Sequence, residues 1–221
     1  KRLPLKIVTL PTRFSFRYHG VHNFERIVNF FDWSVNDSYV VIDFRRCEKA
    51  SYQALALVML YAWKLNTQGC YVKFQFGRAY KDLTKMWRQM GAQGWFSVAQ
   101  SRDDNFNGNK YKPLLAIRDH KDFKLALRKV ERYTVDFDVE YEKTLRYVIS
   151  ELLYNTLEHG RAWATFRESG MRVPSLIQFT WYRERNELHF IIADLGVGIK
   201  KHLEQTYPRF DSDAEAIRRA I

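Results

Sequence analysis

The sequence predicts an α/β protein built from two consecutive sheet-and-helix units. Short runs of β-branched and aromatic residues alternate with helical segments in the first half of the chain. The second half instead carries one long amphipathic stretch followed by two strand-like runs. Hydrophobic residues make up 46% of the 221 residues and charged residues 28%, a composition typical of a globular protein with a substantial core.

The first half alternates strands and helices. Residues 39–44 (YVVIDF) form a β-branched and aromatic run that predicts a buried strand. Residues 51–65 are apolar on most faces and predict a buried helix. Residues 71–76 (YVKFQF) alternate and predict a second strand, and residues 82–90 predict a helix that ends at Gly91. This order favours a parallel or mixed sheet with helices packed on it.

The second half has a different pattern. Residues 141–159 predict one long helix, and Gly160 directly after them is a common helix stop. Residues 176–182 and 188–193 predict two strands joined by the polar turn RERNE. We expect the long helix to pack on this hairpin. Upstream of both, the Asn- and Gly-rich residues 101–112 predict an exposed loop.

Charge is distributed unevenly along the chain. Residues 1–132 hold 24 Lys and Arg against 11 Asp and Glu, a formal charge of +13, whereas residues 133–221 carry −2. This change predicts a boundary between an N-terminal domain, 1–132, and a C-terminal domain, 133–221. A basic half suits nucleic acid, an anionic membrane surface or an acidic protein, and it equally suits a solvated basic surface.

The sequence favours a cytoplasmic protein without a membrane span. The longest apolar run, near residues 54–63, is about half the length of a spanning helix. The basic and then apolar start is too short for a signal peptide. Cys47 and Cys70 are isolated and predict neither a metal site nor a disulfide framework, so they fit a reducing compartment. Motifs for a P-loop, a zinc protease or a nucleophile elbow are absent from the sequence.

The long helix carries a candidate ligand-binding face. Glu151, Asn155 and Glu158 fall within a narrow arc, where a carboxylate and an amide on adjacent turns can meet one ligand. An Asn carbonyl can ligate Mg²⁺, and a nearby Glu can orient a water. The same arc also suits the solvent face of an amphipathic helix. The expected apolar face on the other side consists of Leu145, Ile149, Leu152, Leu153 and Leu157.

A glycine turn follows the second strand of the hairpin. The apolar run HFIIAD ends at Asp194, so this carboxylate stands at a strand end where it can meet a ligand. Gly196 and Gly198 allow the backbone to turn tightly and to approach a nucleotide closely. The combination of E-x-x-x-N on a helix, a hairpin, and D-x-G-x-G at a strand end is more specific than any one of these parts.

Over about residues 140–205 these motifs resemble the GHKL superfamily of histidine-kinase-like ATPases. ELLYNTLEHG at 151–160 matches the N-box, and DLGVGI at 194–199 matches the D-x-G-x-G box. The resemblance implies a Bergerat-type α/β sandwich that binds ATP and Mg²⁺. It implies that Asn155 binds Mg²⁺ and that Glu151 orients or deprotonates a water or assists phosphoryl transfer.

The same resemblance assigns the base-binding residues. It implies that Asp194 accepts a hydrogen bond from the adenine amino group and that Gly196 and Gly198 form the turn beside the base. His159 would lie near the phosphates, although a polar residue at a helix C-terminus is also favoured by the helix dipole. The family continues with a mobile lid and a second glycine-rich box, so we expect the C-terminal domain, which ends at Ile221, to be incomplete.

The N-terminal half resembles the STAS domain, the fold of anti-sigma-factor antagonists. The resemblance is carried by VVIDF, the helix that begins near Ser51, and YVKFQF. In phosphorylated STAS proteins a Ser or Thr stands at the start of that helix, and Ser51 occupies about this place within EKASYQAL rather than a DSSG-like signature. Ser51 is also a good helix N-cap, and we favour the capping role.

Two functions follow from these patterns. The first is an ATP-binding regulatory protein, a GHKL-type ATPase or Ser/Thr-kinase-like switch coupled to a STAS-like domain and acting on a protein partner. The alternative is a non-catalytic interaction module with a vestigial nucleotide site, whose basic half binds a protein or nucleic acid. A protein partner is favoured because the aromatic residues fall at core-like strand positions rather than on a base-stacking surface.

Overall fold

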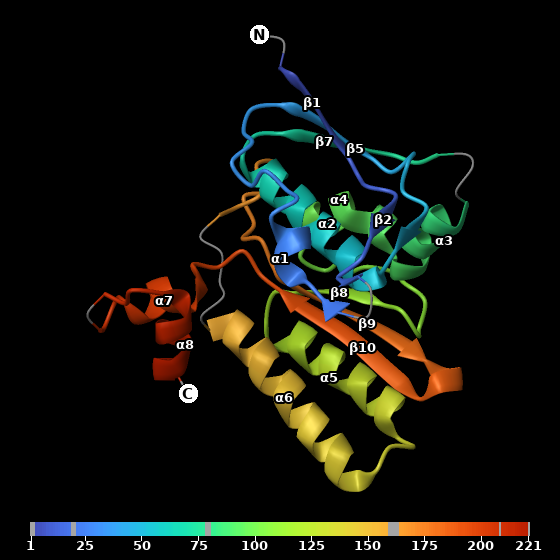
Figure 1. Ribbon diagram of the computed structural model, residues 1–221, viewed down its shortest axis with the longest axis vertical. Helices are drawn as coiled ribbons and strands as arrows, with labels where there is room; N and C mark the ends of the chain where they lie inside the picture. The colour runs from blue at the N-terminus through green and yellow to red at the C-terminus, as the bar shows by residue number, and fades with distance from the viewer. Residues whose placement is uncertain (1–2, 19–20, 78–80, 159–163, 208, 221) are drawn as a thin grey trace.

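The computed structural model describes residues 3–18, 21–77, 81–158, 164–207 and 209–220. Its elements form four stacked layers: a parallel sheet, a layer of helices, an antiparallel sheet and a second layer of helices (Figure 1). The protein is therefore mixed α/β, as the sequence predicts. No helix in these described ranges combines the length and apolarity needed to cross a membrane.

The first sheet is entirely parallel. It consists of β1 (Leu5–Thr9), β5 (Tyr39–Asp43) and β7 (Tyr71–Gln75) in the order β1-β5-β7, with Leu5 opposite Tyr39 and Tyr39 opposite Tyr71. Both strands expected in this half are confirmed. Two short pairs lie outside this sheet: β2 (Arg13–Phe14) with β6 (Lys49–Ala50), and β3 (Arg17–Tyr18) with β4 (Val21–His22).

Helix α2 (Tyr52–Thr67) lies at the centre of the molecule. It contacts β7 of the parallel sheet on one side and β9 and β10 of the antiparallel sheet on the other. This placement explains why the helix is apolar on nearly all faces and why most of its residues, including Trp63, are fully buried. The helix begins where the Ser51 hydroxyl oxygen accepts a hydrogen bond from the Ala54 N–H at 3.2 Å. The capping role of Ser51 is therefore confirmed.

Shorter helices and a long loop complete the layer around α2. Helix α3 ends at Gly91, whose φ of +79° is a left-handed conformation that favours glycine. Residues 101–112 form a loop as expected, but its Phe106 is buried and stacks on Trp63 with ring centroids 5.7 Å apart. This loop therefore covers the core. The helices are α1 (Phe24–Val28), α3 (Lys81–Met90), the 3₁₀ turn η1 (Ala92–Gly94) and α4 (Trp95–Gln100).

The second sheet is antiparallel and carries its own helix layer. Its order is β10-β9-β8, and helices α5 and α6 cover its outer face (Figure 1). The expected hairpin and the packing of the long helix on it are confirmed. The elements are β8 (Leu114–Ile117), α5 (His120–Thr134), α6 (Val139–Glu158), β9 (Ser175–Tyr182), η2 (Arg183–Arg185), β10 (Glu187–Ala193), α7 (Gly198–Leu203) and α8 (Asp213–Ala220).

The second sheet extends across the boundary expected at residues 132/133. That boundary falls inside α5, so β8 and most of α5 precede it while belonging to the second sheet and its helix layer. The two halves also share buried groups, because Leu176 of β9 packs in the same core cluster as α2. The Asn66 amide of α2 donates to the Glu168 carboxylate at 3.1 Å.

Candidate functional site

Helix α6 provides the frame of the candidate site. It begins after Asp138, whose carboxylate accepts hydrogen bonds from the backbone N–H groups of Glu140 and Tyr141, both at 3.1 Å. Its apolar stripe then packs onto the antiparallel sheet and α5. The stripe consists of the buried side chains Ile149, Leu153 and Leu157, with Leu145 partly buried beside them.

The opposite side of α6 presents Glu151 and Asn155 to solvent. Glu151 and Asn155 are both exposed and one helical turn apart, and neither side chain makes a hydrogen bond or ion pair within the described ranges. Leu152, expected on the buried face, is 42% exposed. It lies at the edge of the stripe that faces the sheet, because the apolar arc of α6 is wider than the surface that the sheet covers.

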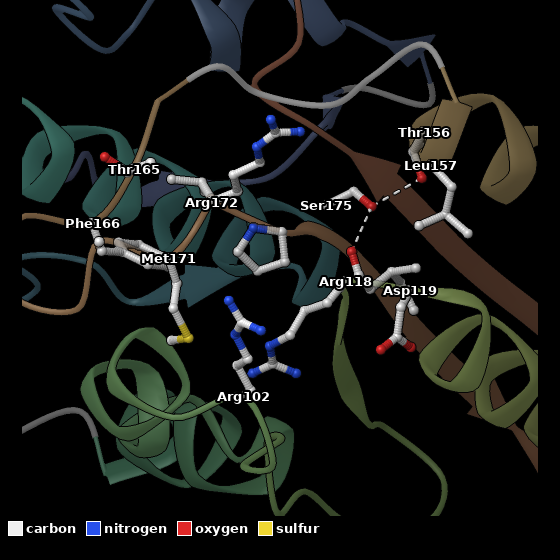
Figure 2. A pocket seen from close by; sticks show the side chains of 14 residues that line it. Arg102, Arg118, Asp119, Thr156, Leu157, Thr165, Phe166, Met171, Arg172 and Ser175 are labelled. Atoms are coloured by element: carbon white, nitrogen blue, oxygen red, sulfur yellow. Dashed lines mark hydrogen bonds between the residues drawn. The ribbon is translucent and has the colours of Figure 1, made fainter.

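Asp194 lies close to the C-terminal half of α6. It directly follows Ala193, which pairs with Leu176 at the end of the antiparallel ladder, so the continuing register leads Asp194 toward Ser175. The Ser175 hydroxyl in turn bonds the Thr156 hydroxyl at 2.9 Å, as Figure 2 shows. Because Thr156 follows Asn155 on the helix, the start of the DLGVGI turn and the C-terminal end of α6 lie at the same end of the sheet.

The Asp194 carboxylate is half-buried. Its Oδ1 accepts a hydrogen bond from the Gly196 N–H at 2.7 Å, and Gly196 is its one donor among the residues that the structure describes. Burial raises the pKa of Asp194 above its ordinary value of 3.8, and the Gly196 hydrogen bond opposes part of that rise. A partly desolvated carboxylate with one oxygen already held is suited to accept a hydrogen bond from a single ligand donor.

The glycine turn leads into a basic cavity. Gly198 has a φ of +80° and begins α7. A cavity of about 870 Å³ opens beside it between α7 and α8. Its lining includes the cations Lys200, Lys201 and Arg209 together with the carboxylates Glu204 and Asp213. This end of the site therefore combines a permissive backbone turn with side chains that can attract an anion.

The structure bears only partly on the expected phosphate and Mg²⁺ contacts. His159, expected near the phosphates, and Gly160, expected to end the helix, lie outside the described residues. Across the described ranges no group of three or more His, Cys, Asp or Glu side chains could hold a metal ion. A Mg²⁺ site completed by water and phosphate oxygens does not need such a group, so Asn155 remains the candidate protein ligand.

Comparisons with models of known families, with curated proteins and with solved structures found no match. The function is therefore argued from the geometry of the site. The hydroxyl pair of Thr156 and Ser175, which links the two motifs, was not expected from the sequence. A helix residue and a strand residue 19 positions apart carry no local pattern that reveals their contact.

Proposed function

We propose that this protein binds an adenine nucleotide with Mg²⁺ where the C-terminal ends of α6 and β10 meet. One juxtaposition carries the proposal. The half-buried acceptor Asp194 lies beside the Ser175–Thr156 hydroxyl pair, next to the helix turn that presents Asn155. An ionised carboxylate can accept a hydrogen bond from the exocyclic amino group of adenine. At the equivalent position guanine has a carbonyl oxygen, which cannot donate a hydrogen bond to the carboxylate.

The residues present fit this ligand. The Asn155 amide is exposed and uncommitted among the described groups, so its carbonyl oxygen can hold Mg²⁺. Lys200 and Lys201 follow the glycine turn and can attract phosphates. Bound Mg²⁺ would neutralise phosphate oxygens, and ATP would supply the phosphoryl group.

Glu151 is the candidate for chemistry. Its carboxylate stands one turn before Asn155 and is open to solvent, so it can accept a proton from a water or from an acceptor hydroxyl. Both uses of ATP suit this geometry: hydrolysis, and transfer to a Ser or Thr of a partner. We propose that either reaction serves as a regulatory switch coupled to the STAS-like N-terminal half.

Titration with a fluorescent ATP analogue, with and without Mg²⁺, tests the proposal. Asp194→Asn should weaken binding by about 1–3 kcal/mol, the worth of one charge-assisted hydrogen bond, and Asp103→Asn on an exposed loop should not. Asn155→Ala should remove the Mg²⁺-dependent part of the affinity. ATP should displace the analogue better than GTP, and equal displacement would refute adenine recognition.

Turnover separates catalysis from binding. Glu151→Ala should preserve analogue binding and lower phosphate release or transfer by roughly two to four orders of magnitude, the range for a lost general base. Glu140→Ala is the matched control, since Glu140 is also exposed on α6 but lies about three turns away from Glu151. Wild-type turnover in Glu151→Ala would show that Glu151 takes no part in the reaction and that this face of α6 has only a structural role.

A second function, the binding of a protein partner, is favoured by the open face of the parallel sheet. Parallel sheets are normally covered on both faces, yet no helix in the described residues covers the outer face of β1-β5-β7 (Figure 1). Leu5, Ile7 and Tyr71 are 62%, 57% and 53% exposed there. Lys73 lies on the same face, and the Arg167 guanidinium carbon is 5.8 Å from the centre of the Tyr71 ring.

These apolar and basic groups suit one occupant, an amphipathic helix of a partner protein with acidic flanks. Fluorescence anisotropy with a labelled acidic amphipathic peptide measures the interaction. Tyr71→Asp should abolish binding, because it introduces a like charge against the peptide, while Tyr147→Asp on exposed α6 should leave it unchanged. Equal binding by both variants would exclude this face.

A further inference from the structure

A second cavity lies where β8 ends and β9 begins, and its volume is about 500 Å³. Four segments far apart in sequence line it: the loop after α4, the turn from β8 into α5, the C-terminal end of α6, and residues 165–175 leading into β9 (Figure 2). We call it the arginine cavity, after Arg102, Arg118 and Arg172 in its lining. Its volume is in the range of pockets that bind small molecules.

Arg118 is the fixed member of this lining. Its Nη1 donates to the Asp122 carboxylate at 3.2 Å, and its Nη2 donates to the backbone carbonyls of Val98 and Asp104 at 3.2 and 2.5 Å. The side chain is largely buried, at 14% exposure. By tying the start of the loop to β8, Arg118 also holds the neighbouring Arg102 at the cavity edge.

The lining carries more positive than negative charge. Arg102 and Arg172 make no ion pair with any described residue. Asp119 is the one carboxylate among the described residues that line the cavity, and it caps α5 by accepting hydrogen bonds from the N–H groups of Lys121 and Asp122 at 2.8 and 3.0 Å. In the view of Figure 2 the guanidinium groups of Arg102 and Arg118 lie on one side of the cavity and that of Arg172 lies on the other.

Like charges gathered around a partly enclosed cavity repel each other until an anion enters. Arg118 is already paired with Asp122, so the guanidinium groups of Arg102 and Arg172, which make no ion pair with a described residue, are left to balance the charge of about −1.5 to −2 on a phosphate monoester. Guanidinium groups also present paired N–H donors that fit phosphate oxygens. The hydroxyls of Thr156, Ser175 and Thr165 add polar groups to the same lining.

The remaining lining is apolar and comes from Leu157, Phe166, Met171 and Pro174 with their neighbours. An inorganic anion alone would leave this surface uncovered. A ligand with a charged end and an apolar body would use both parts of the cavity. We propose that the arginine cavity binds a small phosphate monoester, its phosphate between the arginines and its organic part against Phe166 and Met171.

Calorimetric titration of the whole chain tests this site with phenyl phosphate as the probe. Phenyl phosphate should bind saturably, inorganic phosphate more weakly, and phenol, which lacks the charge, without detectable heat. The absence of saturable phenyl phosphate binding at millimolar concentration would overturn the proposal. Binding of phenol equal to that of phenyl phosphate would also overturn it, because the arginines would then contribute nothing.

The double variant Arg102→Gln with Arg172→Gln should weaken phenyl phosphate binding by at least about tenfold, through lost charge-assisted hydrogen bonds. Arg118 stays unchanged, since it holds the loop. Arg167→Gln is the matched control, because Arg167 belongs to the same 165–175 segment but lies over Tyr71 instead of in the cavity. Unchanged affinity in the double variant, with wild-type thermal stability, would refute the site.

The arginine cavity shares the Thr156 and Ser175 hydroxyls with the proposed nucleotide site, but Asp194 is not among its lining residues, so one further variant separates the two sites. Asp194→Asn should keep wild-type affinity for phenyl phosphate while it weakens the ATP analogue. If Asp194→Asn loses phenyl phosphate binding as well, the two ligands share one site and the proposal of a separate cavity fails. Phenyl phosphate binding without any ATP-analogue binding would support the cavity and count only against the nucleotide site.

Discussion

The surroundings of Asp194 determine both its exposure to solvent and its pKa. At a strand end it would ordinarily be a solvated carboxylate, but it is half-buried, with one oxygen held by the Gly196 N–H. Burial disfavours the ionised form and raises the pKa of Asp194 above 3.8. Burying the Asp194 carboxylate with a single hydrogen-bond donor costs free energy. A ligand that donates a second hydrogen bond to it can offset that cost.

This cost predicts a pH-dependent effect of Asp194→Asn. Between the unfolded pKa near 3.8 and the raised folded pKa, the folded protein binds more protons than the unfolded chain, so stability falls as pH rises through that window. Asparagine keeps an acceptor for Gly196 but carries no charge. The stability gained by the variant should therefore grow as pH rises above about 4 and then level off. Urea denaturation at a series of pH values measures it, and a constant difference would contradict the raised pKa.

Substitution of Ser51 separates its two possible roles, helix N-cap and phosphorylation site. Its hydroxyl caps α2 through the Ala54 N–H. Ser51→Ala should cost about 1 kcal/mol of stability, while Ser51→Asp, which also caps well, should stay near wild type. Chemical denaturation of the three proteins gives the comparison. An alanine variant as stable as wild type would mean that the cap contributes little and that Ser51 is present for another reason.

At the scale of elements, glycines fix how helix α3 meets the long loop. A Cβ built on Gly91, at φ +79°, would lie 2.6 Å from the Gly108 nitrogen. A Cβ on Gly94, three residues later at φ −78°, would meet nothing within 4 Å. The two glycines are close in sequence and differ only in conformation and surroundings, which makes them a matched pair.

Gly91→Ala should therefore destabilise the protein by more than about 1 kcal/mol, because it adds left-handed strain to a backbone clash. Gly94→Ala should change stability by no more than about 0.5 kcal/mol. Thermal or chemical unfolding of both variants decides the point. Equal effects from the two substitutions would show that the approach of Gly91 to the loop is not a tight constraint.

The elements that were expected from the sequence are specified by local patterns, whereas β1, β8 and α5 were not expected. The continuous apolar run of α2 and the alternation in β7 needed no tertiary information. Local patterns do not show which strands pair with each other. The parallel partnership of β1 with β5 and the addition of β8 to the hairpin sheet join residues far apart in the sequence. The exposure of Leu152 was missed for the same reason, since a helix wheel shows an apolar arc but not how much of it a sheet covers.

The whole molecule depends on α2 being shared between two sheets. One core cluster includes Val40 and Ile42 of the parallel sheet, the buried face of α2, and Leu114 and Leu176 of the antiparallel sheet. Charge alone predicted a division near residue 133, because basic residues give way to acidic ones there. Surface charge reports on solvent and partners rather than on packing, so it carries no information about where a core ends.

The packing leads to a prediction about the division of the chain. Fragments 1–132 and 133–221 should each fail to fold cooperatively, because the cut separates β8 and α5 from the sheet and helix that they complete. Fragment 113–221 keeps β8 and α5 and should retain more helical circular dichroism per residue than 133–221.

In the intact chain, tryptophan fluorescence and far-ultraviolet circular dichroism should report one coincident transition in denaturant, since most tryptophans lie in the first half and α5 and α6 in the second. Cooperative unfolding of both 1–132 and 133–221 in isolation would instead establish two domains that meet at residue 133.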